Sequence, residues 1–112
     1  MTELAVLVPV LNRPQNVAPL VESFRAGCPD DAVMDFLTSD ADHEEREAIR
    51  PYLQEGRIHS IRMAEAHTWP EKINWGINRY ADWYLCAADD VRFHPGWWEA
   101  TATLRDLDRI GV

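Results

Sequence analysis

The stretch Leu4-Ala-Val-Leu-Val-Pro-Val10 decides the fold of this chain. A continuous apolar run rich in β-branched residues is typical of a strand that is buried on both faces of a sheet. Asn12-Arg13-Pro14 follows and ends the strand, and Pro14 suits the first turn of a helix. The chain therefore opens with a buried strand that leads directly into a helix.

Beyond this opening, strand patterns and helix patterns alternate along the chain. We predict strands at 4–10, 32–38, 58–63 and 83–88, a short extended piece at 91–93, and helices at 14–27, 43–53, 69–81 and 95–107. Such alternation implies right-handed crossovers and a mainly parallel sheet. We expect one α/β domain over 1–112, of the three-layer Rossmann-like type with helices on both faces. The strand at 83–88 reads as buried, and it should lie beside the central first strand.

Composition excludes several classes of partner. The net charge of −8 argues against nucleic acid or an anionic membrane, because both demand a basic surface. No apolar run reaches the roughly 18–20 residues that a bilayer span needs. The N-terminus lacks the basic and apolar segments of a signal peptide, so we expect a cytoplasmic protein.

Polar residues follow three of the predicted strands. Asn12-Arg13, Ser39 to Asp42 and Asp89-Asp90 all come where a strand ends, and ligands of parallel α/β sheets bind at the carboxyl ends of strands. Asp89 and Asp90 directly follow an apolar strand, where a hard cation such as Mg²⁺ or Mn²⁺ would compensate their charge. The alternative is a pair of solvated turn aspartates.

Four segments resemble motifs of the family 2 glycosyltransferases, which have the GT-A fold. Val8-Pro-Val-Leu-Asn-Arg13 is similar to the end of the first strand of that family, and Lys72-Ile-Asn-Trp-Gly-Ile-Asn78 to its basic-x-Asn-x-Gly helix. Tyr84-Leu-Cys-Ala-Ala-Asp-Asp-Val91 resembles the strand that ends in the metal-binding DxD, and Pro95-Gly-Trp-Trp-Glu99 the segment after it. Together these segments span most of the chain in the order of the family. The resemblance implies the donor-binding half of a glycosyltransferase, with a nucleoside-diphosphate sugar as partner.

The resemblance also implies a role for each matching residue around the nucleobase. Pro9 and Asn12 would shape the loop under the base, and Arg13 would lie near the base or the phosphates. Asp40, or alternatively Asp42, would hydrogen-bond the base as the second-strand aspartate of the family does.

A second set of implied roles concerns the diphosphate. Lys72 would lie near the phosphates at a helix start, where free N–H groups favour anions. Asp90 would coordinate Mn²⁺ or Mg²⁺, and Asp89 would support it or touch the ribose. Ala88 stands where the family has the first carboxylate of DxD, so one ligand of the metal is missing.

The catalytic base of the family has no evident counterpart in this sequence. Glu99 and Asp106 lie on a predicted helix that reads as scaffold. Three functions therefore stay open: a metal-dependent sugar transferase that obtains its base elsewhere, a non-catalytic nucleotide-sugar-binding module, and an interaction domain without a ligand. A homodimer through the C-terminal helix, with Trp97 and Trp98, would be one way to complete the site.

Other chemically reactive residues have simpler interpretations. His43 with Glu44, Glu45 and Glu47 resembles a metal cluster by composition, but we interpret the group as a solvated helix face. His94 is interpreted as a loop histidine.

Two further tryptophans, Trp69 and Trp75, are ambiguous. An indole ring stacks on a sugar or a base, but it also serves in a core or on a partner surface. The sequence alone does not distinguish these roles.

Overall fold

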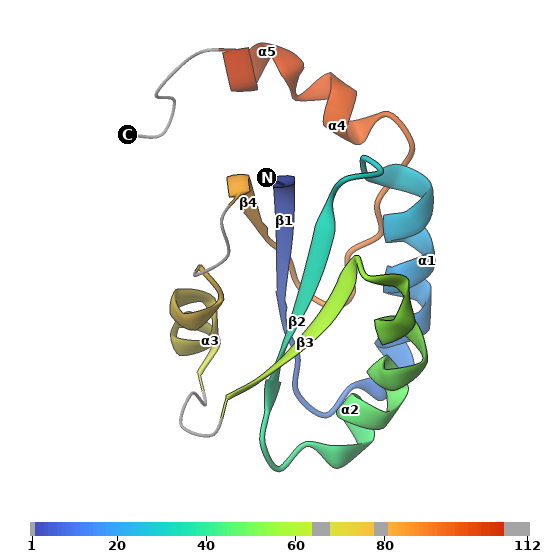
Figure 1. Cartoon of the computed structure of the whole chain (residues 1–112), viewed down its shortest axis with the longest axis vertical. Coiled ribbons are helices and arrows are strands. Elements are labelled where there is room, and N and C mark those ends of the chain that lie inside the picture. Colours follow the sequence, from blue (N-terminus) through green and yellow to red (C-terminus); the bar gives the residue numbers. More distant parts are fainter. Residues whose placement is uncertain (1, 64–67, 78–80, 107–112) are drawn as a thin grey trace.

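The computed structural model describes residues 2–63, 68–77 and 81–106, and its centre is a four-stranded parallel sheet (Figure 1). The strands are β1 (Thr2–Pro9), β2 (Val33–Ser39), β3 (Ile58–Met63) and β4 (Ala81–Cys86). Their order is β3-β2-β1-β4, and each neighbouring pair is parallel. The predicted neighbourhood of the first strand and the strand at 83–88 is therefore confirmed.

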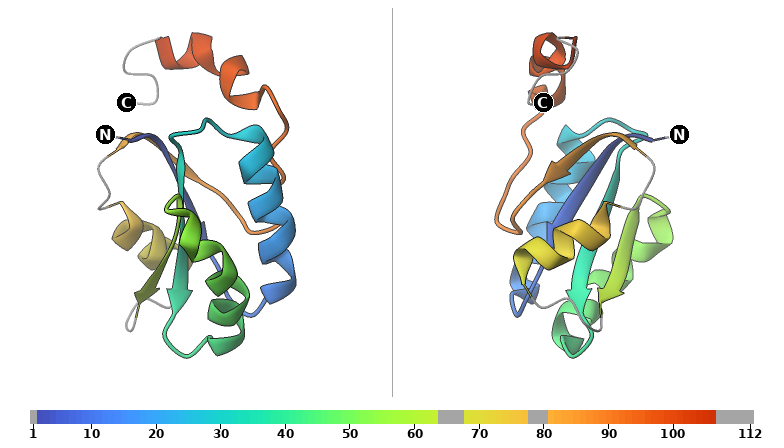
Figure 2. Two further views of the ribbon diagram at one scale, coloured as in Figure 1. Left: turned by 45° about the vertical axis from the view of Figure 1, so that its right-hand side comes forward. Right: turned by 90° about the vertical axis from the view of Figure 1, so that its left-hand side faces the viewer.

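Helices cover both faces of this sheet. They are η1 (Pro14–Asn16), α1 (Val17–Gly27), α2 (His43–Ile49), η2 (Arg50–Glu55), α3 (Trp69–Gly76), α4 (Trp97–Ala100) and α5 (Ala102–Asp106). Helices α1 and α2 lie on one face and α3 lies on the other (Figure 2). The predicted three-layer α/β fold of the Rossmann-like type is confirmed. No helix in the described part of the chain is long and apolar enough to cross a membrane.

Strand β1 is buried on both faces, as its apolar run predicts. Val6 and Val8 belong to the core that α1 covers, whereas Leu7 packs with Leu37 and Ile73 beneath α3. Successive side chains of a strand point to opposite faces, so an unbroken apolar run fills both cores.

Helix α3 lies very close to the sheet. A Cβ atom at Gly76 would come within 2.9 Å of Leu37 Cδ1 and 3.3 Å of Leu7 Cδ1, so only glycine fits there without a shift of these side chains. At the other end of the helix, Thr68 and Glu71 form a capping box: the Thr68 hydroxyl accepts from the Glu71 backbone N–H, and the Glu71 carboxylate accepts from the Thr68 N–H. These two features fix α3 beside the carboxyl end of β1.

Strand β4 differs from its prediction as a buried strand. It forms an edge of the described sheet, and Trp83 and Cys86 are exposed. The reason is that β4 has one strand neighbour, and that α3 packs over β1 and β2. An apolar run indicates a strand, but its neighbours decide how deeply it is buried.

The second helix is also shorter than predicted. The α-helical part ends at Ile49 and continues as the 3₁₀ helix η2, because Pro51 has no N–H to donate to the preceding turn. Leu53, expected on the buried stripe, is 39% exposed.

The C-terminal helix predicted at 95–107 begins at Trp97 and is interrupted at Thr101. The Thr101 hydroxyl donates to the Trp98 carbonyl at 2.6 Å and so competes with the helical hydrogen bonds. The predicted extended piece at 91–93 forms no strand. At the end of α3, Ile77 is exposed instead of buried, and Tyr80 lies outside the described residues.

Candidate functional site

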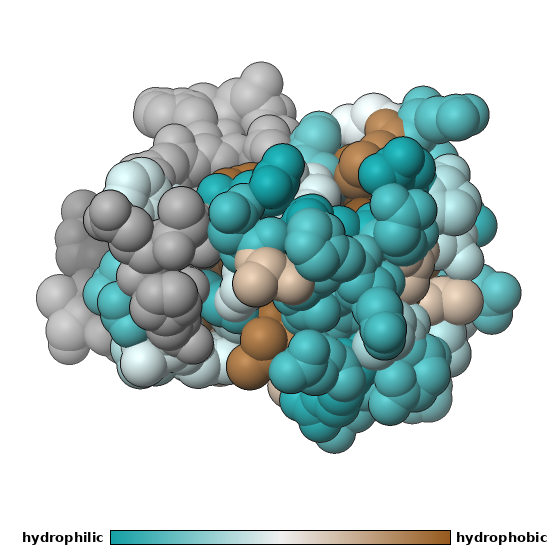
Figure 3. All heavy atoms as spheres, turned by 90° about the horizontal axis from the view of Figure 1, so that it is seen from below, coloured by the Kyte–Doolittle hydropathy of each residue, from teal (hydrophilic) through white to brown (hydrophobic). Residues whose placement is uncertain are grey.

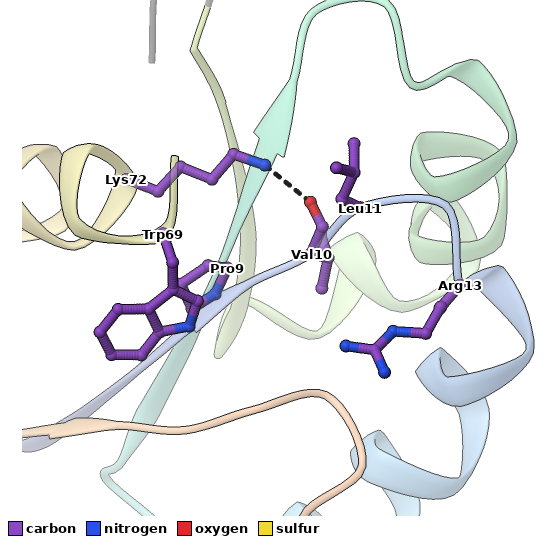
Figure 4. Close-up of a pocket in the computed structure, with 6 residues that line it drawn as sticks. All are labelled: Pro9, Val10, Leu11, Arg13, Trp69 and Lys72. Carbon is purple, nitrogen blue, oxygen red and sulfur yellow. Dashed lines mark hydrogen bonds between the residues drawn. The ribbon is translucent and has the colours of Figure 1, made fainter. Parts of the chain in front are cut away.

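A pocket opens at the carboxyl edge of the sheet, where β1 ends and α3 begins (Figure 4). Its lining residues are Pro9, Val10, Leu11, Arg13, Trp69 and Lys72. Its volume of about 210 Å³ is below the roughly 300–1,000 Å³ of complete small-molecule sites. The surrounding edge of the sheet is mostly hydrophilic (Figure 3). The pocket is thus a small hollow on a mostly hydrophilic side of the molecule.

The loop at residues 10–13 forms the floor of this pocket and has a fixed conformation. Asn12 has a φ of 56°, in the left-handed region that asparagine tolerates better than most residues. Its backbone N–H donates to Asp42 Oδ2 at 2.8 Å, and the Val10 N–H donates to the Leu37 carbonyl at 3.1 Å. Asp42 therefore holds the turn, and β2 anchors the start of the loop.

Lys72 holds the same loop from the opposite helix. Its Nζ donates to the Val10 carbonyl at 2.8 Å, and the residue is 2% exposed (Figure 4). It is the only lysine in the chain. Burial lowers the pKa of this ammonium group, while the nearby carboxyls of Asp42 and Glu45 act in the opposite direction. Although Lys72 lines the pocket, its charge already stabilises the loop.

Arg13 connects the pocket to a buried carboxylate. Its Nη2 lies 3.0 Å from Asp89 Oδ1, and the Asp89 side chain is 1% exposed whereas that of Arg13 is 54% exposed. The adjacent Asp90 is exposed. The two aspartates that follow β4 thus have different environments: Asp89 faces inward to Arg13 and Asp90 faces solvent.

Glu45 corrects the interpretation of its helix as a solvated face. It is fully buried, and neither carboxylate oxygen forms a hydrogen bond with a side chain among the described residues. Burial is the main reason why the pKa of Glu45 is raised to about 7, and the Asp42 carboxylate acts in the same direction. A hydrogen bond from the Arg13 backbone amide opposes them, Asp89 again raises the pKa, and the Arg13 guanidinium lowers it.

These side chains form one group, which we call the buried charge cluster: Arg13, Asp42, Glu45, Lys72 and Asp89. The five residues come from four parts of the chain: the loop at 10–13, the β2–α2 turn with α2, helix α3, and the segment after β4. When Glu45 is protonated, two cations face two carboxylates and the cluster is neutral. Buried charges are tolerated when they are paired in this way.

Asp40 lies apart from this cluster. Its carboxylate is 55% exposed and pairs with Arg62, whose Nη2 is 2.6 Å from Asp40 Oδ1. It does not line the pocket. Of the two aspartates that follow β2, Asp42 holds the loop and Asp40 faces solvent.

The described residues fit a divalent metal only in part. Nowhere in 2–63, 68–77 or 81–106 do three histidine, cysteine or acidic side chains gather in a way that could hold a metal. Asp89 is engaged by Arg13, so Asp90 is the carboxylate that faces outward. Mg²⁺ and Mn²⁺ are often held by one or two carboxylates together with substrate phosphates. The donor set therefore fits a metal that arrives with a phosphate ligand.

The sequence reasoning missed the burial of Glu45 and the place of Trp69 in the pocket. The burial of Glu45 could have been inferred from the sequence. Glu45 lies one helical turn before Ile49, on the same side of the helix as Ile49 and Tyr52, which pack on the core. Trp69 carries no such signal. Its position depends on the close packing of α3 on the sheet.

The sheet order and the covering helices define a parallel α/β fold of the Rossmann-like type, with the pocket at the end of β1. Among solved structures, the crystal structure of the glycosyltransferase S. aureus TarS 1-349 is similar to this chain with a TM-score of 0.77. The match has 10% sequence identity and covers 99% of this chain and 38% of that chain. This chain thus spans well under half the length of the chain it matches, and the likeness shows the fold. No protein-family profile matches the sequence, and no curated protein sequence is significantly similar to it.

Proposed function

We propose that this chain binds the nucleoside-diphosphate part of a sugar nucleotide in the pocket above the loop at 10–13. In this proposal it is the donor-binding part of a glycosyltransferase. The observation that carries the proposal is the position of Arg13, Trp69 and the start of α3 around one pocket, at the carboxyl end of the central strand of a glycosyltransferase-like sheet.

Each wall of the pocket suits one part of such a ligand. The Trp69 ring is 49% exposed and lies beside Pro9, where it offers an aromatic surface to a planar base (Figure 4). Stacking of a base on an aromatic side chain contributes about 1–3 kcal/mol. The Arg13 guanidinium, on the other side of Val10, suits a phosphate because its planar fork binds two oxygens at once.

Three more residues complete the proposed site. Asp40 is the exposed carboxylate for a contact with the base, since Asp42 is held by the Asn12 amide. Asp90 would ligate Mg²⁺ or Mn²⁺, which neutralises charge on a departing diphosphate as a Lewis acid. Asp89 would act through Arg13.

A second function, binding without catalysis, is favoured by the composition of the pocket. None of the described residues that line it carries a carboxylate or an imidazole. Transfer of the sugar needs a base that activates the acceptor hydroxyl, and the described lining residues supply no such base.

The proposal is tested by isothermal titration calorimetry with UDP, GDP and ADP, each with Mn²⁺ and with EDTA. We expect one of them to bind, and to bind more tightly with Mn²⁺. Arg13→Lys keeps a positive charge beside Asp89 but loses the planar fork, and should weaken binding about tenfold, or about 1.4 kcal/mol. Asp90→Asn should abolish the effect of the metal.

Arg50→Gln is the matched control, because Arg50 is exposed and pairs with Glu47 on the surface. It should bind as the parent does. The proposal fails if none of the three nucleotides binds, or if Arg13→Lys and Arg50→Gln are indistinguishable in affinity.

A further inference from the structure

The buried carboxylate of Glu45 has no part in the proposed site, although it lies under the loop that forms it. We propose that Glu45 is a positioning residue that takes up a proton when an anionic ligand enters the pocket, and so keeps the buried charge cluster neutral. This inference rests on the proposed function for the class of ligand.

The geometry around Glu45 leaves its charge poorly compensated. The residue is 0% exposed, and no side chain donates a hydrogen bond to its oxygens in the described part of the chain. The Arg13 backbone amide offsets only part of the effect of burial. The charged groups that act on it are Arg13 from the loop, Asp42 from the β2–α2 turn, Asp89 from the segment after β4, and Lys72 from α3. Helix α1, which packs against α2, contributes apolar side chains to the core between them.

Both cations near Glu45 have other partners. Lys72 donates to the Val10 carbonyl, and Arg13 pairs with Asp89. Because the pKa of Glu45 is about 7, roughly half of the molecules carry its proton at neutral pH. An anion that binds in the pocket would therefore change the fraction of molecules in which Glu45 is protonated.

A phosphate ligand disfavours the ionised form of Glu45 in two ways. It brings negative charge to the other side of the loop, and it draws the Arg13 guanidinium away from the carboxylates of the cluster. Both effects raise the pKa of Glu45 in the complex above its value of about 7 in the free protein. By linkage, binding then takes up a proton, and affinity must fall as pH rises above about 7.

The pKa of Glu45 determines the pH range over which affinity changes and the direction of the change. Well below pH 7 Glu45 is protonated in both states, so its contribution to affinity is constant. From pH 7 up to the pKa in the complex, log Kd rises by up to one unit per pH unit. The terminal phosphate of a nucleoside diphosphate titrates near pH 6, so measurements with UDP between pH 7 and 9 separate Glu45 from the ligand itself. Pyrophosphate loses its last proton within this range, so for that ligand the difference between the parent and Glu45→Gln at each pH reports the titration of Glu45.

The test is calorimetric titration of the full chain with UDP and with inorganic pyrophosphate, in EDTA, from pH 6 to 9. Each pH is measured in two buffers with different enthalpies of ionisation, which reports the protons taken up on binding. For the parent we expect uptake that is greatest between pH 7 and 8, and affinity that falls about tenfold for each unit by which the pKa rises. Glu45→Gln has the same shape without a titrating proton, and should show no uptake and a flat profile above pH 7.

Glu44→Gln is the matched control, since Glu44 is exposed on the same helix. It should retain the uptake and the pH profile of the parent. If Glu45→Gln does not fold, the Glu45 side-chain carbon resonance of the parent, followed by NMR with and without UDP, gives the same pKa change directly.

The outcomes separate the two proposals. Binding without proton uptake, or with an identical pH profile in the parent and Glu45→Gln, overturns the role of Glu45 and leaves the nucleotide site intact. Absence of binding by both UDP and pyrophosphate at every pH overturns the site itself, and the role of Glu45 with it.

Discussion

The two ends of the central strand lie in opposite kinds of environment. At the carboxyl end of β1, Lys72, Asp42, Glu45 and Asp89 are buried, and Val10, Asn12 and Arg13 of the following loop each have a defined partner. At the amino end, a trough of about 250 Å³ between β4 and the C-terminal helices is lined mainly by apolar side chains. There Trp83 is 37% exposed and Leu104 is 55% exposed.

The polar contacts of the amino end are also of another kind. Trp98 Nε1 and Arg105 Nη1 both donate to Glu3 Oε1 at 3.1 Å, near the surface. Arg105 also covers the Trp98 ring, with its guanidinium carbon 3.8 Å from the ring centroid. These contacts are partly buried, since the Arg105 side chain is 19% exposed and that of Glu3 is 42% exposed. An ion pair at the surface contributes about 0–1 kcal/mol, whereas a broken buried pair costs about 3–5 kcal/mol.

The two ends of β1 are therefore held by different kinds of contact. The amino end is held by aromatic packing that tolerates change. The carboxyl end fixes a loop with charges removed from water, an arrangement that costs stability and that is typical of a pre-organised site. The expected homodimer through the C-terminal helix stays a prediction, and the exposed Leu104 belongs to the surface it would use.

The largest effect should come from removal of the buried cation. Lys72→Met keeps the length of the side chain but leaves Asp42 and the Val10 carbonyl without the ammonium, and should lower the free energy of unfolding by about 3 kcal/mol. Arg105→Met, at the other end of β1, should cost about 1 kcal/mol or less. Urea denaturation followed by circular dichroism measures both, and equal losses would remove the contrast between the two ends.

A smaller effect is expected for Trp69, where a substitution should change nucleotide affinity but hardly change the free energy of unfolding. Trp69→Ala should weaken the binding of nucleoside diphosphates by about 1–3 kcal/mol, because it removes the aromatic wall of the pocket. The free energy of unfolding should change by less than about 0.5 kcal/mol, since the ring is half exposed.

Trp75→Ala is the matched control for Trp69. Trp75 lies on the same helix and is 61% exposed, but it does not line the pocket. Its affinity should equal that of the parent. A loss of the same size in both variants would indicate that the helix surface, and not the pocket, governs binding.

The third effect concerns pH and stability without a ligand. The pKa of Glu45 is raised from its model-compound value of 4.5 to about 7 in the folded protein, so the folded state holds this proton more tightly than the unfolded state. The resulting stability is complete below about pH 4.5 and is lost as pH rises towards 7. Thermal unfolding should therefore show that Glu45→Gln gains on the parent over this window by about 3 kcal/mol, the size of a shift from 4.5 to about 7. A constant difference from pH 4.5 to 8 would mean that Glu45 titrates normally.

The smallest effect is expected in the trough. Leu104→Ala should change the free energy of unfolding by less than about 0.5 kcal/mol and should leave nucleotide affinity unchanged. Analytical ultracentrifugation of the parent and of this variant tests the expected dimer. A nucleotide affinity that falls with Leu104→Ala would place the ligand at the wrong end of β1.

The parts of the fold that the sequence predicted are those determined by local pattern. The apolar run of β1, the stripe of α1 and the capping box at Thr68 each depend on residues within one or two turns of each other. The edge position of β4 was missed because it depends on which elements pack beside it. A strand with an apolar sequence looks the same whether one neighbour or two cover it.

The site was predicted in part for the same reason. The polar ends of β1, β2 and β4 indicated where a ligand would bind, and the structure brings Pro9, Arg13 and Lys72 into one pocket. The partners of these residues were not predictable, because Arg13 and Asp89 are distant in sequence and meet only through the parallel pairing of β1 with β4. Burial of Glu45 likewise follows from tertiary packing.

The most direct test of the central claim is an NMR titration of the ¹⁵N-labelled chain with UDP, GDP and ADP in the presence of Mg²⁺. It observes both ends of β1 in one experiment. We predict that one nucleotide shifts the backbone amides of 10–13 and of Trp69, Glu71 and Lys72 in a saturable manner, while those of 97–105 stay unchanged. Shifts confined to the trough, or no shift with any of the three nucleotides, would contradict a nucleoside-diphosphate site at the carboxyl end of β1.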